Sequence, residues 1–194
     1  MTIHREVKSD VGAAPLEIAI AREPREVEAA QRLRFRVFGE ELGAVLPSAA
    51  SGLDRDAFDP FCDHLLVREA TSGDVVGTYR ILPAGVRRAR EGSYTATEFD
   101  LGRLVGAARI GRGRPGVHRP ALSNGSVLAL LWAGLAAHLR TSGCEHVMGC
   151  ASLPANDTGY AADACARLLR DHGAPREWQV TPSPAAAARR RESR

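Results

Sequence analysis

The sequence predicts an α/β (α+β) fold in which a mixed central sheet is flanked by helices. Short runs of alternating apolar residues, typical of strands, interleave with longer runs whose apolar residues lie three or four positions apart, typical of helices. The chain has 194 residues, of which 44% are hydrophobic. This length and composition suit one domain that can bury its own core.

The first half of the chain is predicted to form three strands and one helix. The expected elements are a strand, a helix, a loop and a two-stranded hairpin, at Leu16–Ala21, Arg25–Phe38, Gly43–Asp54, and His64–Arg68 with Val75–Leu82. The turn Ala70–Asp74 of the hairpin is rich in turn-forming residues. Pro83 ends the second strand, because proline has no N–H to donate to a ladder.

The second half is predicted to alternate helices with shorter strands. The expected elements are a short irregular or helical piece, a strand end with a loop, a helix, a strand and a second helix, at Tyr94–Leu101, Val117–Gly125, Ser126–Arg140, Cys144–Cys150 and Asp157–His172. The helix Ser126–Arg140, capped by Asn124 or Ser126, is apolar on all sides, so we expect it to be largely enclosed.

The domain boundaries follow from composition. Residues 1–15 are expected to be a flexible lead-in, residues 16–181 the folded domain, and residues 182–194 a disordered tail rich in Ala and Arg. Gly102–Gly116 has no clear pattern, and its glycines with Pro115 predict an interrupted central strand.

Charge and cysteine usage limit the class of protein. The net charge is only +3, but Arg103–Arg119 holds five arginines and no acid, which favours an anionic partner unless the segment is simply a solvated loop. We expect no nucleic-acid partner, because this segment has no interleaved aromatic residues. The four cysteines have no zinc spacing, so no metal is expected.

No signal peptide is visible in residues 1–15, and the most apolar run is shorter than the roughly 20 residues that cross a bilayer. We therefore expect a cytoplasmic protein. A peripheral contact with the inner face of the membrane stays open.

An acidic loop is the first candidate site. Asp54, Asp56, Asp59 and Asp63 lie within ten residues. Grouped carboxylates bind amines or metals, but this loop lacks the central glycine and late bidentate acid of a calcium loop. We interpret it as a rim that holds a substrate ammonium and accepts its proton, with a turn-and-capping cluster as the alternative.

Two arginines belong with this loop. Arg80 ends an apolar strand, and a buried arginine needs an anionic partner, most simply one of the loop aspartates. We expect Arg80 to organise the site, or otherwise to clamp a substrate carboxylate. Arg34 and Phe38 lie one helical turn apart and face the same way, so either can be a substrate contact or a structural residue.

The loop before the helix Ser126–Arg140 is a candidate anion site. A strand end leads through a polar, glycine-containing loop to a helix start, where free N–H groups and the helix dipole favour a phosphate. The residues concerned are Val117, His118, Arg119, Asn124 and Gly125. His118 can be a base or an ordinary loop residue, and Asn124-Gly125 can be an ordinary turn.

Several motifs together resemble the ornithine-type N-acyltransferases of the GNAT superfamily, over about Ile18–Leu153. They are Leu33-Arg34-Phe35-Arg36-Val37-Phe38, Phe58-Asp59-Pro60, Cys62-Asp63-His64-Leu65-Leu66-Val67, Val76-Gly77-Thr78-Tyr79-Arg80-Ile81-Leu82, Tyr94 with Glu98-Phe99-Asp100-Leu101, Gly113-Arg114, Val117-His118, Leu130-Leu131-Trp132-Ala133-Gly134-Leu135, and Gly149-Cys150-Ala151-Ser152-Leu153. The first-helix arginine and phenylalanine, the acidic loop and Arg80–Pro83 are also similar to acyl-homoserine-lactone synthases, which we rank second.

The resemblance implies a GNAT fold whose splayed central sheet admits a pantetheine arm. It implies transfer of a fatty acyl group from acyl carrier protein or acyl-CoA to the amine of an amino acid such as ornithine, without a metal. An acidic acyl carrier protein would suit the arginine-rich segment. The expected catalytic residues are Asp56, Asp59 and Glu98; Arg34, Phe38, Arg80 and Arg114 would bind the acceptor, and the helix-start loop the donor.

The chain departs from the family pattern at one position. Where the family has Glu-Leu-Gly-Arg, this chain has Gly111-Arg112-Gly113-Arg114, so the glutamate is absent. That difference motivates a further alternative, a catalytically degenerate protein that binds acyl thioesters without turning them over.

Overall fold

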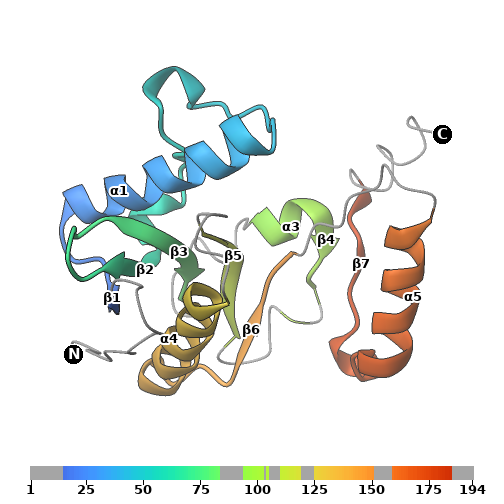
Figure 1. Cartoon of the computed structure of the whole chain (residues 1–194). Coiled ribbons are helices and arrows are strands. Elements are labelled where there is room, and N and C mark those ends of the chain that lie inside the picture. The colour runs from blue at the N-terminus through green and yellow to red at the C-terminus, as the bar shows by residue number, and fades with distance from the viewer. Residues whose placement is uncertain are drawn as a thin grey trace.

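A computed structural model describes residues 15–83, 94–102, 104, 110–118, 125–150 and 159–184. Its main sheet has the strand order β1-β2-β3-β5-β6 (Figure 1). The strands are β1 (Leu16–Ile20), β2 (Asp63–Glu69), β3 (Val75–Leu82), β5 (Ile110–His118) and β6 (His146–Met148). The first four pair antiparallel and β5 pairs parallel with β6, which confirms the predicted mixed sheet.

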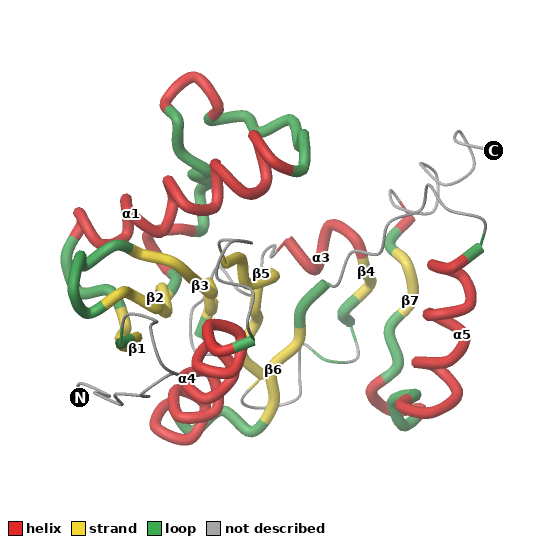
Figure 2. Tube along the Cα trace, viewed as in Figure 1, coloured by secondary structure: helices red, strands yellow, loops and turns green. Residues whose placement is uncertain are grey.

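The described residues also form helices. These are α1 (Pro24–Arg34), α3 (Tyr94–Glu98), α4 (Ser126–Ser142) and α5 (Tyr160–His172), with a π-helix at Phe35–Glu41 and 3₁₀ turns at Ala49–Ser51, Asp59–Phe61 and Arg176–Trp178. α1 and α4 cover opposite faces, whereas α5 stands at the end of the molecule away from β1 (Figure 2). A separate two-stranded sheet pairs β4 (Phe99–Asp100) with β7 (Thr181–Pro182).

The start of α1 is fixed by a capping box between Glu23 and Glu26, with Pro24 in the first turn. The Glu26 carboxylate also accepts a hydrogen bond from Arg68 on β2 at 2.5 Å. Burial alone would raise the pKa of Glu26, but the hydrogen bonds from Arg22, Arg68 and Glu23 lower it to about 2. The predicted helix is confirmed, although its last turn is a π-helix from Phe35 onward.

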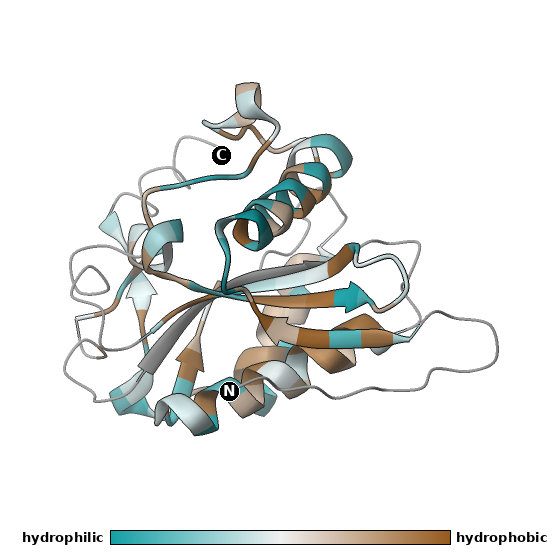
Figure 3. Ribbon diagram, turned by 90° about the vertical axis from the view of Figure 1, so that its left-hand side faces the viewer, coloured by the Kyte–Doolittle hydropathy of each residue, from teal (hydrophilic) through white to brown (hydrophobic). Residues whose placement is uncertain are grey.

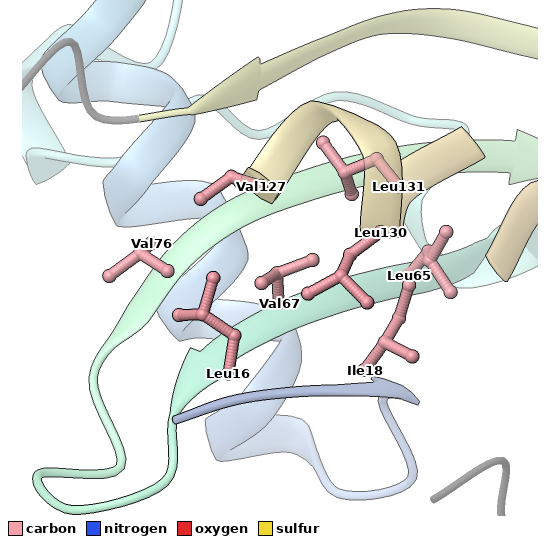
Figure 4. Close-up of a cluster of buried hydrophobic side chains, with 8 residues drawn as sticks. All are labelled: Leu16, Ile18, Leu65, Val67, Val76, Val127, Leu130 and Leu131. Carbon is pink, nitrogen blue, oxygen red and sulfur yellow. The ribbon is translucent and has the colours of Figure 1, made fainter. Parts of the chain in front are cut away.

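The core lies between the sheet and α4 (Figure 4). Its buried members are Leu16, Ile18, Leu65, Val67, Val76, Val127, Leu130 and Leu131. Gly134 allows α4 to approach β1 closely, because a Cβ there would lie 2.3 Å from Ile18 Cδ1. The helix and the hairpin predicted from the sequence are thus packed directly on each other.

The expected interruption of the central strand is wrong. β5 forms a continuous strand, with Arg114 opposite Arg80 and Val117 opposite Thr78. Pro115 and Gly116 together lie opposite Tyr79, so the extra residue forms a β-bulge. A proline is tolerated there because a bulge does not require its missing N–H.

Two other expectations need correction. α4 is not enclosed, because Leu128 is 48% and Trp132 61% exposed on its outer side, and its N-cap is Gly125 in a left-handed conformation. The first residues of the tail that was expected to be disordered are structured. Pro182 belongs to β7, and Ser183 Oγ donates a hydrogen bond to the Thr97 carbonyl oxygen at 2.7 Å. The expectations for residues 1–14 and 185–194 fall outside the described residues.

Candidate functional site

A buried network of arginines and aspartates lies where the end of α1 meets the start of β2 and the end of β3. Arg34 is the last residue of α1, Arg80 lies near the end of β3, and His64 lies near the start of β2. The acidic loop between the π-helix and β2 supplies three carboxylates, from Asp54, Asp56 and Asp59. The fold thus brings three of the four predicted aspartates and both predicted arginines together, whereas Asp63 lies beside His138, 3.4 Å from its Nε2.

Arg34 connects the end of α1 to this loop through hydrogen bonds and ion pairs. Its side chain is 2% exposed. Its Nε donates to Asp54 Oδ2 at 2.9 Å, and its Nη2 donates to the Asp54 carbonyl oxygen at 2.6 Å and to Asp59 Oδ1 at 2.9 Å. Charge-assisted bonds of this kind are about twice as strong as neutral ones, so they hold the loop in one conformation.

Arg80 binds the other side of the loop. Its Nη1 donates to Asp59 Oδ1 at 2.9 Å and to Asp56 Oδ1 at 2.8 Å, and its Nη2 donates to Asp56 Oδ2 at 2.7 Å. The pairing with Asp56 is therefore bidentate, which fixes both groups in one plane. The prediction that Arg80 pairs with loop aspartates is confirmed.

His64 is buried beside Arg34. Its Nε2 is 3.2 Å from the Asp59 carbonyl oxygen, and its Nδ1 is 3.4 Å from Arg34 Nη1. Since the guanidinium can only donate, Nδ1 accepts and Nε2–H donates, which assigns a neutral imidazole. Burial and the charge of Arg34 lower the pKa of His64, although the Asp59 carbonyl acts in the opposite direction.

The carboxyl of Asp59 stays ionised. Burial alone would raise its pKa, but the positive charge of Arg34, the Asp56 N–H at 2.9 Å and Arg80 outweigh burial and lower it. The Asp59 carboxylate also raises the pKa of Arg80, together with Asp56. Nearby, burial raises the pKa of the Cys62 thiol to about 12, so this cysteine is not a thiolate nucleophile near neutral pH.

The carboxylates of the network differ in exposure. Asp54 and Asp59 are buried against Arg34, with 6% and 4% of their side chains exposed, whereas Asp56 has 31% of its side chain exposed. Asp56 is therefore the carboxylate of this network that an ammonium group can reach from solvent.

The other predicted site residues lie on neighbouring elements. Phe38 lies on the π-helix and packs against the cluster of Leu33 and Val37. Glu98 is the last residue of α3, and its carbonyl oxygen accepts a hydrogen bond from the Ser183 N–H. Arg114, Val117 and His118 lie in the second half of β5, where their backbones pair with β3. Gly125 immediately precedes α4. Arg119 and Asn124 lie outside the described residues.

One member of the network, His64, was not selected from the sequence as a candidate site residue. A hairpin with its turn at Ala70–Asp74 pairs His64 with Arg80, and the structure has this pair, although the register shifts by one residue between Val67 and Arg68. Asp54 belongs to the predicted acidic loop, but the sequence did not indicate that its carboxylate would turn inward to Arg34. Among the described residues, no three His, Cys, Asp or Glu side chains gather as metal ligands, and the counter-ions of the acidic loop are arginines.

Comparison with known proteins identifies the family of the chain. Residues 33–133 match the family described as an acetyltransferase (GNAT) domain. The chain belongs to the GNAT family. Its relatives include the L-ornithine N(alpha)-acyltransferase of Agrobacterium fabrum, 38% identical over 180 residues, and that of Rhodobacter capsulatus, 37% identical over 177 residues. The predicted relationship to ornithine-type acyltransferases is thereby confirmed.

The alignments with these two relatives cover most of this chain but only part of the relatives. They include 87% of this chain and 61% of the Agrobacterium protein, and 85% of this chain and 68% of the Rhodobacter protein. The chain therefore spans about three fifths of the length of the first relative.

Solved structures agree on the GNAT fold. One is FeeM, an N-acyl amino acid synthase from uncultured soil microbes, with a TM-score of 0.55 at 14% identity over 82% of this chain and 79% of FeeM. Another is the AHL synthase LasI, with a TM-score of 0.52 at 14% identity over 71% of this chain and 72% of LasI. At these identities the likeness concerns the fold alone.

Proposed function

We propose that this chain transfers a fatty acyl group from a thioester donor, acyl carrier protein or acyl-CoA, to the amine of an amino acid such as ornithine. The single observation that carries the proposal is the placement of the Asp56 carboxylate, which pairs bidentately with Arg80 while 31% of its side chain stays exposed. Membership of the GNAT family supports acyl transfer as the reaction class, and the ornithine acyltransferase relatives support the acceptor.

The carboxylates have different roles in this proposal. Asp59 is a positioning residue, because its Oδ1 accepts from both arginines and its Oδ2 accepts from the Asp56 N–H. Its lowered pKa also makes it a weak base. Asp56 holds the ammonium of the acceptor. The ammonium loses a proton through Asp56, Glu98 or water, and the free amine attacks the thioester carbonyl. The tetrahedral intermediate then breaks its C–S bond, and the donor's thiolate leaves and takes up the second proton released from the nitrogen, which gives the amide and the free thiol.

The donor lies along β5. β6 pairs with β5 only at Ile110, Gly111 and Arg112, so within the described residues no strand pairs with the β6-facing edge of the rest of β5. A pantetheine arm can lie along such an edge and bond to it as an added strand would. Backbone N–H groups at the bulge near Val117 then stabilise the oxyanion, and the loop ending at Gly125 binds the donor phosphate.

Mass spectrometry of a defined incubation tests the proposed activity. The purified protein is incubated with acyl carrier protein thioesters of mixed chain length, or with acyl-CoA, and with ornithine, lysine and glycine. We expect an N-acyl amino acid, and we expect Asp56→Asn to lower kcat/KM by about 10²-fold. Asp74→Asn, in an exposed turn, is the matched control, and circular dichroism verifies folding. Absence of product with both donor classes contradicts the proposal.

The second candidate is a protein that binds acyl thioesters without turnover, and Gly111 in place of the family glutamate favours it. Gly111 lies in the part of β5 that pairs with β6, opposite Val147. This candidate predicts saturable binding of the acyl carrier without product, and no turnover after Gly111→Glu. Product from Gly111→Glu alone would instead show that the site lacks only its base. An acyl-homoserine-lactone-like activity would appear as an acylated lactone in a parallel incubation that also contains S-adenosylmethionine as the acceptor.

A further inference from the structure

The outer face of α4 is apolar and open. Leu128 and Trp132 are 48% and 61% exposed, and Ala129, Ala133 and Ala136 are exposed beside them. The opposite side of the same helix forms the core. The hydropathy view shows α4 brown to pale over most of its length, whereas α1 on the other face of the sheet is largely teal (Figure 3). A helix without a polar face normally has apolar surroundings on all sides.

The charge on this helix has one sign. α4 contains no aspartate or glutamate, and its ionisable residues, His138 and Arg140, lie in its last two turns. His138 Nε2 lies 3.4 Å from Asp63 Oδ2, whereas Arg140 is exposed. The exposed apolar residues thus share a helix with the cation Arg140 and with no carboxylate. This combination favours contact with an anionic surface.

The size and shape of this face decide what can cover it. A stable protein–protein interface takes about 20–30 residues on each side, and this face exposes five. A second copy meeting it through α4 alone would therefore bind too weakly. The surface of a helix is also convex, whereas small molecules bind in concave sites.

We propose that the outer face of α4 docks on an anionic lipid surface. The helix lies in the plane of the headgroups, with Leu128 and Trp132 entering the apolar layer and Arg140 meeting lipid phosphates. Tryptophan prefers this boundary because its ring is apolar while its N–H needs a polar partner. Within the described residues no helix is long and apolar enough to cross a bilayer, so the contact is made on the surface.

Trp132 reports on this contact directly. The chain has two tryptophans, so Trp178→Phe leaves Trp132 as the single emitter. The variant is mixed with vesicles of phosphatidylglycerol and phosphatidylcholine, and separately with pure phosphatidylcholine. We expect a blue shift of emission, protection from acrylamide and at least about fivefold more co-sedimentation with the anionic vesicles. The test needs no acyl transfer, so its outcome is independent of the proposed function.

Matched variants locate the contact. Leu128→Glu with Ala133→Glu is expected to abolish co-sedimentation and the blue shift. Leu168→Glu with Leu169→Glu, on the exposed side of α5, is expected to leave both unchanged. Circular dichroism confirms that each variant is folded.

Four outcomes overturn the proposal: no vesicle binding, equal loss in both pairs of variants, Trp132 already shielded from acrylamide in the lipid-free monomer, or a concentration-dependent blue shift without lipid. The last outcome would indicate a second copy of the chain on this face.

Discussion

Single residues at the candidate site depend on one another because their charges are buried. Asp59 Oδ1 accepts from both Arg34 and Arg80, so neither arginine can be removed without leaving a carboxylate short of a partner. Burying an ion is expensive, and its partner offsets that cost only with good geometry. The network therefore contributes more to the precision of the site than to net stability.

Replacing Arg34 tests this dependence. Arg34→Met keeps most of the side-chain volume but removes one guanidinium from the buried carboxylates of Asp54 and Asp59. We expect a loss of about 3–5 kcal/mol in the free energy of unfolding, measured by urea denaturation. Arg36→Met, at an exposed position two residues on, should change stability by less than about 0.5 kcal/mol. Equal effects of the two changes would contradict the assigned network.

His64 should make stability depend on pH. Its pKa in the folded protein lies below the ordinary value of about 6.5, so below that pH the unfolded chain binds a proton that the folded chain does not. Stability is therefore complete above about pH 6.5 and falls as the pH drops toward the folded pKa. We expect His64→Gln to flatten the curve of unfolding free energy between pH 7 and 5. His146→Gln, at an exposed histidine, is the control, and a curve unchanged in His64→Gln would contradict the prediction.

The pairing of Arg80 with loop aspartates could be predicted, because a buried strand-end arginine needs an anion. The distribution of roles among the aspartates could not. Asp59 begins a 3₁₀ turn and is buried, whereas Asp56, three residues earlier, reaches solvent. Spacing alone does not determine which carboxylate such a loop turns inward.

At the scale of elements, the contact between α4 and the sheet depends on Gly134. Gly134→Leu would force a side chain into the space held by Ile18 and Leu65, which we expect to cost about 1–3 kcal/mol despite the better helix propensity of leucine. Ala133→Leu adds a similar side chain on the outer face, where space is open, and should be nearly neutral. Thermal unfolding without lipid compares the two, and equal melting temperatures would contradict this packing.

Periodicity located α1, the hairpin, α4 and α5, because each is a continuous run with one dominant spacing. It failed for β5, since Pro115 and the glycines appear to a local pattern as breaks, whereas the partner strand absorbs them in a bulge. It also could not show which side of α4 is covered, because a helix apolar all round has no distinct face.

At the scale of the whole molecule, the strand order was beyond local reasoning. β5 joins β3 although α3 and β4 intervene in the chain, and β6 joins β5 in parallel after α4. Only the resemblance to a known family implied this arrangement, which brings the bulged strand beside the strand that holds Arg80. The described network itself takes its residues from α1, the acidic loop, β2 and β3, and the topology sets the backbone of β5 next to Arg80.

The field of the whole molecule should decide which donor is used. Arg103–Arg119 holds five arginines and no acid, and an acyl carrier protein is a large anion whose encounter depends on summed charge. We expect Arg103→Glu with Arg109→Glu to raise KM for the carrier-bound donor by at least about tenfold and to leave KM for acyl-CoA and kcat nearly unchanged. Arg167→Glu with Arg170→Glu on α5 changes net charge equally and is the control. Because the Debye screening length falls as salt rises, the attraction between the arginines and the carrier weakens. The wild-type KM for the carrier should therefore also rise between about 50 and 500 mM salt. Equal effects of the two double variants would mean that net charge, rather than this segment, attracts the carrier.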